Sequence, residues 1–136
     1  MIESAIVAAL LADPAVVALV ADRVYETEVP ERGMSDTRPA VVVADRVSAT
    51  NPVSQDGAGA AGVYRIQVDA WARSRAKAHE VAASVRAALN GKAGIFAGEA
   101  LQMIAQAPGS ERSFRDREVG LHRTTADYMV HAAEAA

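Results

Sequence analysis

The strongest constraint on the fold is one segment, residues 62–91, in which a strand-like pattern gives way to a helical one. In its first part Tyr64, Ile66 and Val68 alternate with polar residues, which is typical of a strand with one buried face. In its second part apolar residues recur at helical spacing, at Ala78, Val81, Ala82, Val85, Ala88 and Leu89. Because the strand leads directly into the helix, we predict that the helix packs on the sheet to which the strand belongs.

Further segments supply the rest of the predicted architecture. Residues 120–131 repeat the strand alternation, residues 40–48 are rich in β-branched residues, and residues 24–29 and 100–106 are shorter strand candidates. Before them, apolar residues from Ile2 to Leu10 share a helical face, and Asp13 and Pro14 end that helix and begin another. We therefore predict an α+β fold: a mainly antiparallel sheet of four to five strands, one long helix packed on one face, and a short N-terminal helical hairpin. The length of 136 residues fits a single domain, 1–136.

Composition and charge exclude several classes of protein. The chain has no cysteine, which excludes a disulfide framework and any thiolate metal site. It has 14 basic and 17 acidic residues, a balance that argues against a dedicated nucleic-acid binder. No apolar run approaches the roughly 20 residues needed to span a bilayer, and Glu3 stands where a secretory signal would be basic. We expect a soluble protein that has no contact with a membrane.

Several motifs resemble chemical sites but lack the context that such sites need. Residues 57–62 read GAGAAG, yet a dinucleotide site requires a strand before the glycines and a helix after them, whereas here a polar segment precedes and a strand follows. The three histidines, His79, His122 and His131, do not have the spacing of a zinc site. We therefore predict no catalytic residue, no cofactor and no metal.

Polar residues on the two main strands are better explained as the outer face of the sheet. Asp69 and Asp127 could be pictured as a pair of hydrolytic carboxylates, but each alternates with apolar residues that would face the helix. The same alternation predicts a polar outer face made of Arg65, Gln67, Asp69, Arg123, Thr125 and Asp127. We expect ion pairs across the strands there. Trp71 falls on this side at the end of its strand, either as an interface anchor or in local packing.

The order of these segments resembles the tail-completion proteins of long-tailed phages, also called tail terminators or head-tail joining proteins. The resemblance is carried by the opening MIESAIVAALLADPAVVALVADRVY, the central RPAVVVADRVS, YRIQVDAWA with the helix after it, and the closing GLHRTTADYMVH. It implies a structural virion protein, not an enzyme, that forms a ring, commonly a hexamer, which caps the tail tube and joins the tail to the head. The implied partners are further copies of the chain, the tail tube protein and head-tail connector proteins.

The resemblance also implies a location and a set of contacts. The protein would be made in the host cytoplasm and reside at the head-proximal end of the tail, where DNA passes through the lumen without specific binding. The polar segment 108–120, which we predict to be a loop, would add docking residues to the outer face. The candidate subunit or tail interface is Arg65, Gln67, Asp69, Trp71, Arg123, Asp127, Arg112, Phe114, Arg115 and Arg117. Two alternatives stay open: another head-tail connector or minor tail component, and a small ligand-binding domain or enzyme.

Overall fold

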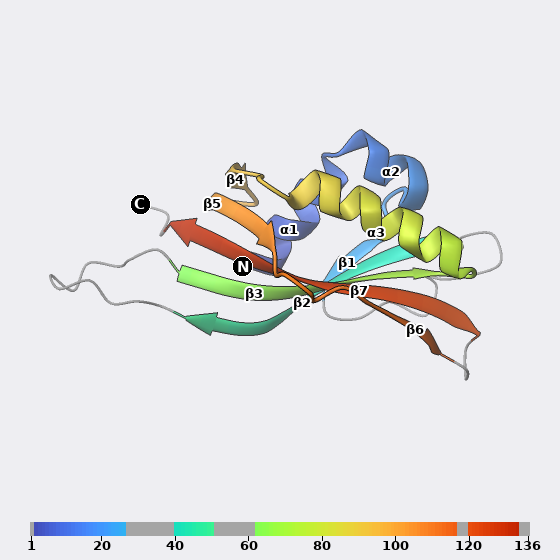
Figure 1. Ribbon diagram of the computed structural model, residues 1–136. Helices are drawn as coiled ribbons and strands as arrows, with labels where there is room; N and C mark the ends of the chain where they lie inside the picture. The colour runs from blue at the N-terminus through green and yellow to red at the C-terminus, as the bar shows by residue number, and fades with distance from the viewer. Residues whose placement is uncertain (1, 27–39, 51–61, 117–119, 134–136) are drawn as a thin grey trace, which may run out of the picture.

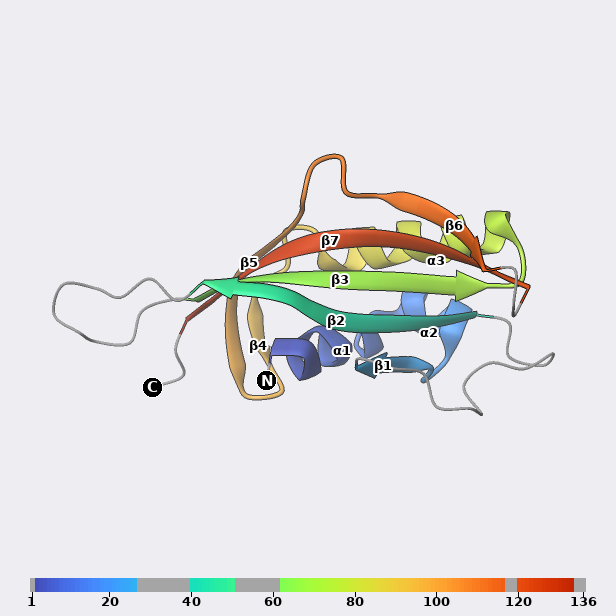
Figure 2. The same ribbon diagram turned by 90° about the horizontal axis from the view of Figure 1, so that it is seen from below.

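The computed structural model describes residues 2–26, 40–50, 62–116 and 120–133. All three described helices lie on one face of a sheet, and the opposite face carries none of them (Figures 1 and 2). The elements in chain order are α1 (Ile2–Leu11), α2 (Pro14–Val20), β1 (Val24–Glu26), β2 (Ala40–Thr50), β3 (Gly62–Ala72), α3 (Arg75–Leu89), β4 (Gly94–Phe96), β5 (Glu99–Gln106), β6 (Arg112–Asp116) and β7 (Leu121–Ala133).

The sheet has the order β1-β2-β3-β7-β5-β4, with β6 paired to β7 beside β5. All neighbouring strands are antiparallel except β1 and β2, which are parallel. Five of the seven strands have five residues or more, and β1 and β4 have three each. The predicted α+β class, with a mainly antiparallel sheet, a long helix on one face and a helical hairpin at the start, is confirmed.

The N-terminal hairpin forms where the sequence predicts it. Asp13 caps α2 by accepting hydrogen bonds from the N–H groups of Ala15 and Val16 at 2.9 and 3.2 Å, and Pro14 occupies the first turn. The two helices meet at 89°. No single described helix is long and apolar enough to cross a membrane; α1 and α2 reach that length and apolarity only together, across this bend. The apolar face of α1 is buried in the core.

Hydrogen bonds at both ends hold α3 in place on the sheet. Ser74 caps the helix by accepting a hydrogen bond from the Lys77 N–H at 3.1 Å. At the other end Asn90 accepts a hydrogen bond from the Gln106 N–H at 2.8 Å, and Gly91, with φ of +76°, donates its N–H to Ile104 at 2.8 Å. Both ends of the helix are thereby fixed, and its buried side packs on the inner face of β3 and β7. The buried residues of the helix are Ala78, Val81, Ala82, Val85, Ala88 and Leu89.

The predicted loop at 108–120 is wrong in part, because it contains strand β6. This strand pairs in antiparallel register with the start of β7, Phe114 opposite Arg123 and Arg115 opposite His122. An edge strand can be polar on both sides, since it needs only backbone hydrogen bonds from its neighbour to form. For this reason apolar alternation, the signal used to predict the other strands, is missing here.

Some expectations lie outside the described residues. These are the glycine-rich segment up to residue 61, the last part of the predicted strand 24–29, and Arg117 in the candidate interface.

Candidate protein-interaction surface

The outer face of the sheet carries the polar residues that the sequence placed there. In the register of β3 and β7, Gln67 lies opposite Asp127, Asp69 opposite Thr125, and Trp71 opposite Arg123. Residues at alternate positions point away from the helices, so these side chains share the face that no described helix covers (Figure 2). We name this set, together with Arg65, Arg112 and Phe114, the outer surface.

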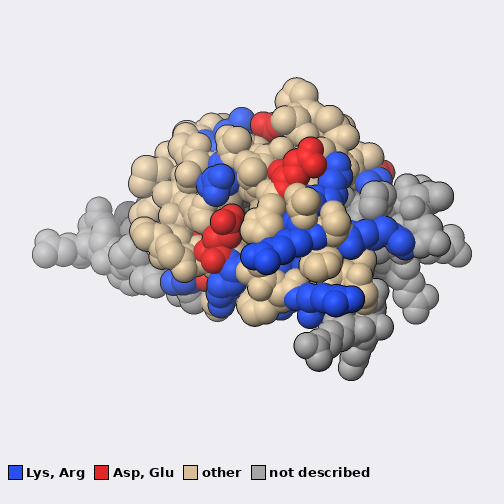
Figure 3. Space-filling view, turned by 45° about the vertical axis from the view of Figure 1, so that its right-hand side comes forward, with Lys and Arg blue, Asp and Glu red and all other residues tan. Residues whose placement is uncertain are grey.

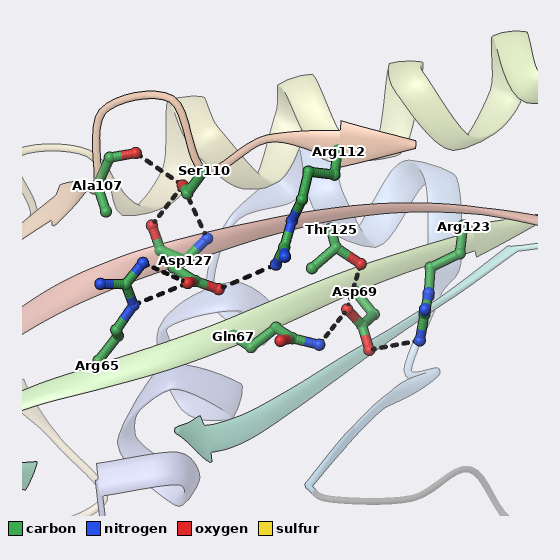
Figure 4. A network of polar contacts seen from close by, with 9 residues as sticks. All are labelled: Arg65, Gln67, Asp69, Ala107, Ser110, Arg112, Arg123, Thr125 and Asp127. Carbon is green, nitrogen blue, oxygen red and sulfur yellow. Dashed lines mark hydrogen bonds and ion pairs between the residues drawn. The ribbon is translucent and has the colours of Figure 1, made fainter. Parts of the chain in front are cut away.

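An ion pair between neighbouring strands organises the middle of the outer surface. Arg65 donates its Nε–H to Oδ2 of Asp127 at 2.8 Å, and its Nη2 lies 2.7 Å from the same oxygen (Figure 4). The Asp127 side chain is only 8% exposed, while that of Arg65 is 40% exposed. Nη2 of Arg112 lies 3.9 Å from the other oxygen, Oδ1, which has no hydrogen-bond partner among the described residues. The predicted ion pairing across the strands is confirmed.

Asp69 forms a second centre two residues along β3. Thr125 donates its hydroxyl to Oδ1 of Asp69 at 2.6 Å, and Gln67 donates its side-chain N–H to the same oxygen at 3.1 Å (Figure 4). Nη1 of Arg123 lies 3.9 Å from Oδ2. Arginine side chains and hydrogen-bond donors thus surround both aspartates.

Arg123 joins three strands through aromatic contacts. Its guanidinium carbon lies 5.2 Å from the ring centroid of Trp71 on β3 and 5.0 Å from that of Phe114 on β6. Each such contact contributes about 0.5–1 kcal/mol at an exposed site. Phe114 is 44% exposed, a large apolar side chain on the surface. Exposed aromatic residues stacked on arginine are typical of the anchors of protein interfaces.

Ser110 supports the outer surface from the turn between β5 and β6. One edge of β7 pairs first with β6 and then with β5, and Asp127 lies between the two paired stretches. On this edge the backbone groups of Asp127 therefore have no strand partner. The Ser110 hydroxyl accepts a hydrogen bond from the Asp127 N–H at 3.1 Å and donates to the Ala107 carbonyl at 2.7 Å (Figure 4). The Ala107 N–H donates to the Asp127 carbonyl at 2.8 Å. No pattern in the sequence indicates this role, since it depends on a turn folding against a distant strand.

The structure brings together eight of the ten residues in the predicted interface. Arg115 is the exception among the described ones: alternation along β6 places it, with His122 of β7, on the helix side of the sheet. There it lines a cleft with residues of α3 and β7. His122 and Asp127 therefore point to opposite faces of β7, and Asp127 does not line this cleft.

Comparison with known proteins agrees with this geometry. A family model described as tail completion protein gp17 matches residues 4–132. No curated protein matches the chain. Among solved structures, a chain in the virion of a native gene transfer agent (GTA) particle has the same fold, with a TM-score of 0.76 and 20% sequence identity over 96% of this chain and 93% of that chain. The match spans nearly all of the chain, and it confirms the resemblance drawn from the sequence. The chain belongs to the tail completion protein gp17 family, a family of structural phage-tail proteins and not of enzymes.

Proposed function

We propose that six copies of this chain form a closed ring, which caps the tail tube at its head-proximal end and joins the tail to the head. The whole chain acts as one domain in this role. Its partners are other copies of itself, the tail tube protein and the head-tail connector proteins. Assembly takes place in the host cytoplasm, and the ring then remains in the virion.

The observation that carries the proposal is the outer surface itself. In a closed ring, one face of each subunit contacts a different face of the next. The outer surface suits such a contact because no described helix covers it and because its ion pairs and aromatic stack already fix the side chains. Side chains that are ordered before binding lose less entropy on binding. The candidate contact residues are Arg65, Gln67, Asp69, Trp71, Arg112, Phe114, Arg123 and Asp127.

The net charge supports passage of DNA through the ring without specific binding. With a formal net charge of −3 per chain, the subunits as a whole repel a phosphate backbone. A subunit without a net attraction for phosphate leaves DNA free to move through a channel, whereas a basic lining would hold it.

Light scattering after size exclusion, over a range of protein concentrations, tests the proposal. A hexamer has a mass of six times 14.2 kDa, about 85 kDa. The double variant W71A/F114A should dissociate this species. The control is L11A, which removes an exposed apolar side chain, 38% exposed, from α1 on the other side of the sheet.

Three outcomes contradict the proposal. One is a monomer at every concentration that also fails to bind purified tail tubes. Another is a ring that L11A dissociates and W71A/F114A does not, which would place the contact on the helix layer. The third is a stable species of another size with no affinity for tubes, which would favour a different connector or minor tail component.

A further inference from the structure

A cleft of about 210 Å³ lies on the helix side of the sheet, between the start of α3 and the pair β6 and β7. Arg75 approaches it from α3, Arg115 and Ser113 from β6, and His122, Arg123 and Thr124 from β7. None of the described residues that line the cleft is acidic. Figure 3 shows lysine and arginine side chains gathered on the face of the molecule turned to the viewer, with a few acidic side chains beside them.

Two of the three arginines that line the cleft, Arg75 and Arg115, are not neutralised within the described part of the chain; the third, Arg123, lies 3.9 Å from Oδ2 of Asp69. Arg75 makes one contact, from its Nε–H to Nε2 of His79 at 3.4 Å, and neither Arg75 nor Arg115 has an ion pair with a described residue. The arginines of the outer surface, by contrast, each lie within 4 Å of an aspartate oxygen. The positive end of the α3 dipole adds to the charge at Arg75.

The cleft is also held in shape by contacts between its walls. The Ser113 hydroxyl lies 3.2 Å from Nε2 of His79 and 3.4 Å from the hydroxyl of Thr124, which connects β6 to α3 and to β7. These contacts fix the distance between the wall that carries Arg75 and the wall that carries Arg115. An anionic group that enters the cleft would meet guanidinium groups from both sides.

We propose that this cleft binds a glutamate or aspartate side chain from an acidic segment of another tail protein. Arginine forms bidentate hydrogen bonds with a carboxylate, and the volume of the cleft suits one or two side chains. A DNA duplex is a poorer occupant, because its phosphates are contacted by extended basic stripes on a surface and not in a recess. Exposed Phe114 at the rim provides the apolar contact that protein partners use.

This inference goes beyond the ring and does not rest on it. Its key residues, Arg75 and Arg115, lie on the helix side of the sheet, whereas the proposed ring contact uses the outer surface. The two proposals can therefore be tested separately. W71A/F114A tests the ring, and variants that retain both Trp71 and Phe114 test the cleft.

The test follows the arginine side-chain signals of the full chain by NMR at low salt. The probe is the capped peptide Gly-Ser-Glu-Glu-Ser-Gly, and the control peptide has glutamine in place of both glutamates. We expect the glutamate peptide alone to shift the signals of Arg75 and Arg115, at millimolar or lower concentration. R75Q and R115Q should each weaken binding about tenfold.

A matched variant controls for general charge. R86Q removes an arginine from the same helix but outside the cleft, and should leave the affinity unchanged. Circular dichroism checks that all three variants are folded. Equal weakening by R86Q, no shift at Arg75 and Arg115, or an equal response to the glutamine peptide would overturn the proposal. Tighter binding of a short DNA duplex at the same signals would overturn it too, in favour of a nucleic-acid site.

Discussion

Replacing Arg65 with methionine tests how strongly the buried carboxylate of Asp127 depends on its ion pair. Methionine retains much of the apolar stem but removes both contacts to Oδ2, at 2.8 and 2.7 Å. Removing one partner of a buried ion pair costs about 3–5 kcal/mol, because the other charge is left desolvated. Arg65 is 40% exposed, so solvent already screens the pair, and Arg112 remains 3.9 Å from Oδ1. We therefore expect R65M to lower the free energy of unfolding by about 2 kcal/mol.

A double-mutant cycle separates the ion pair from the other effects of the substitution. D127N removes the charge but retains the backbone of residue 127, so the contacts to Ser110 and Ala107 persist. The double variant R65M/D127N leaves no unpaired carboxylate and should lose about 1 kcal/mol less stability than the sum of the single variants. The control is R86M, since Arg86 pairs with Glu111 at 3.6 Å and both side chains are more than a third exposed. Its cost should stay below about 1 kcal/mol.

Denaturant unfolding at low protein concentration is the assay, because any oligomer would add to the apparent stability. A loss of about 2 kcal/mol corresponds to a decrease in Tm of roughly 6–8 °C for a chain of this length. Two results would contradict a stabilising role of the ion pair. One is that R65M lowers the free energy of unfolding no more than R86M does, and the other is that the effects of R65M and D127N are additive within about 0.3 kcal/mol. Either result would mean that water solvates the Asp127 carboxylate well enough without Arg65.

Three further predictions follow from other contacts. S110A should lower the free energy of unfolding by about 1–3 kcal/mol, measured by denaturation against S113A, because it leaves the Asp127 N–H buried without an acceptor. Burial raises the pKa of Tyr128 to about 12, so the folded state keeps a proton that the unfolded state loses near pH 10. Stability should therefore decrease between about pH 10 and 12, by at most about 3 kcal/mol, and Y128F should reduce this decrease in an alkaline titration of the unfolding free energy. R123A should increase acrylamide quenching of Trp71, the only tryptophan, whereas R112A should not, since no ring of a described aromatic residue is stacked on Arg112.

The parts of the fold that the sequence predicted are those in which apolar spacing determines the buried face. In β3 the alternation of Ile66 and Val68 with Gln67 and Asp69 assigns each side chain to one side of the sheet. The same holds for β7, so the composition of the outer surface followed once both strands were recognised. Asp13 and Pro14 likewise predicted the break between α1 and α2 through local capping chemistry alone.

What could not be predicted depends on which segments meet in space. Arg65 pairs diagonally with Asp127, not with the residue opposite it in register, Met129, and only the observed register reveals this. The role of Ser110 requires that the turn after β5 fold against β7. The sequence predicts a loop around Arg115, and alternation has no meaning in a loop, so the prediction places Arg115 in one interface with its neighbours. Because the segment forms strand β6, Arg112 and Phe114 lie on the outer side of the sheet and Arg115 lies on the helix side.

This division of residues between the two sides of the sheet bears on the two contacts that we propose for the chain. An antiparallel sheet can leave one face in water, so the absence of a covering helix alone does not indicate a binding surface. The outer surface differs from a merely solvated face in its buried Asp127 carboxylate and in an arginine enclosed by Trp71 and Phe114, both of which cost desolvation. On the other side of the same strands the cleft carries Arg75 and Arg115, which have no ion pair with a described residue. Arg123 belongs to the outer surface and also lines the cleft. A partner that moves the Arg123 side chain at one of these sites changes the other site too, so the two contacts can be coupled through this residue.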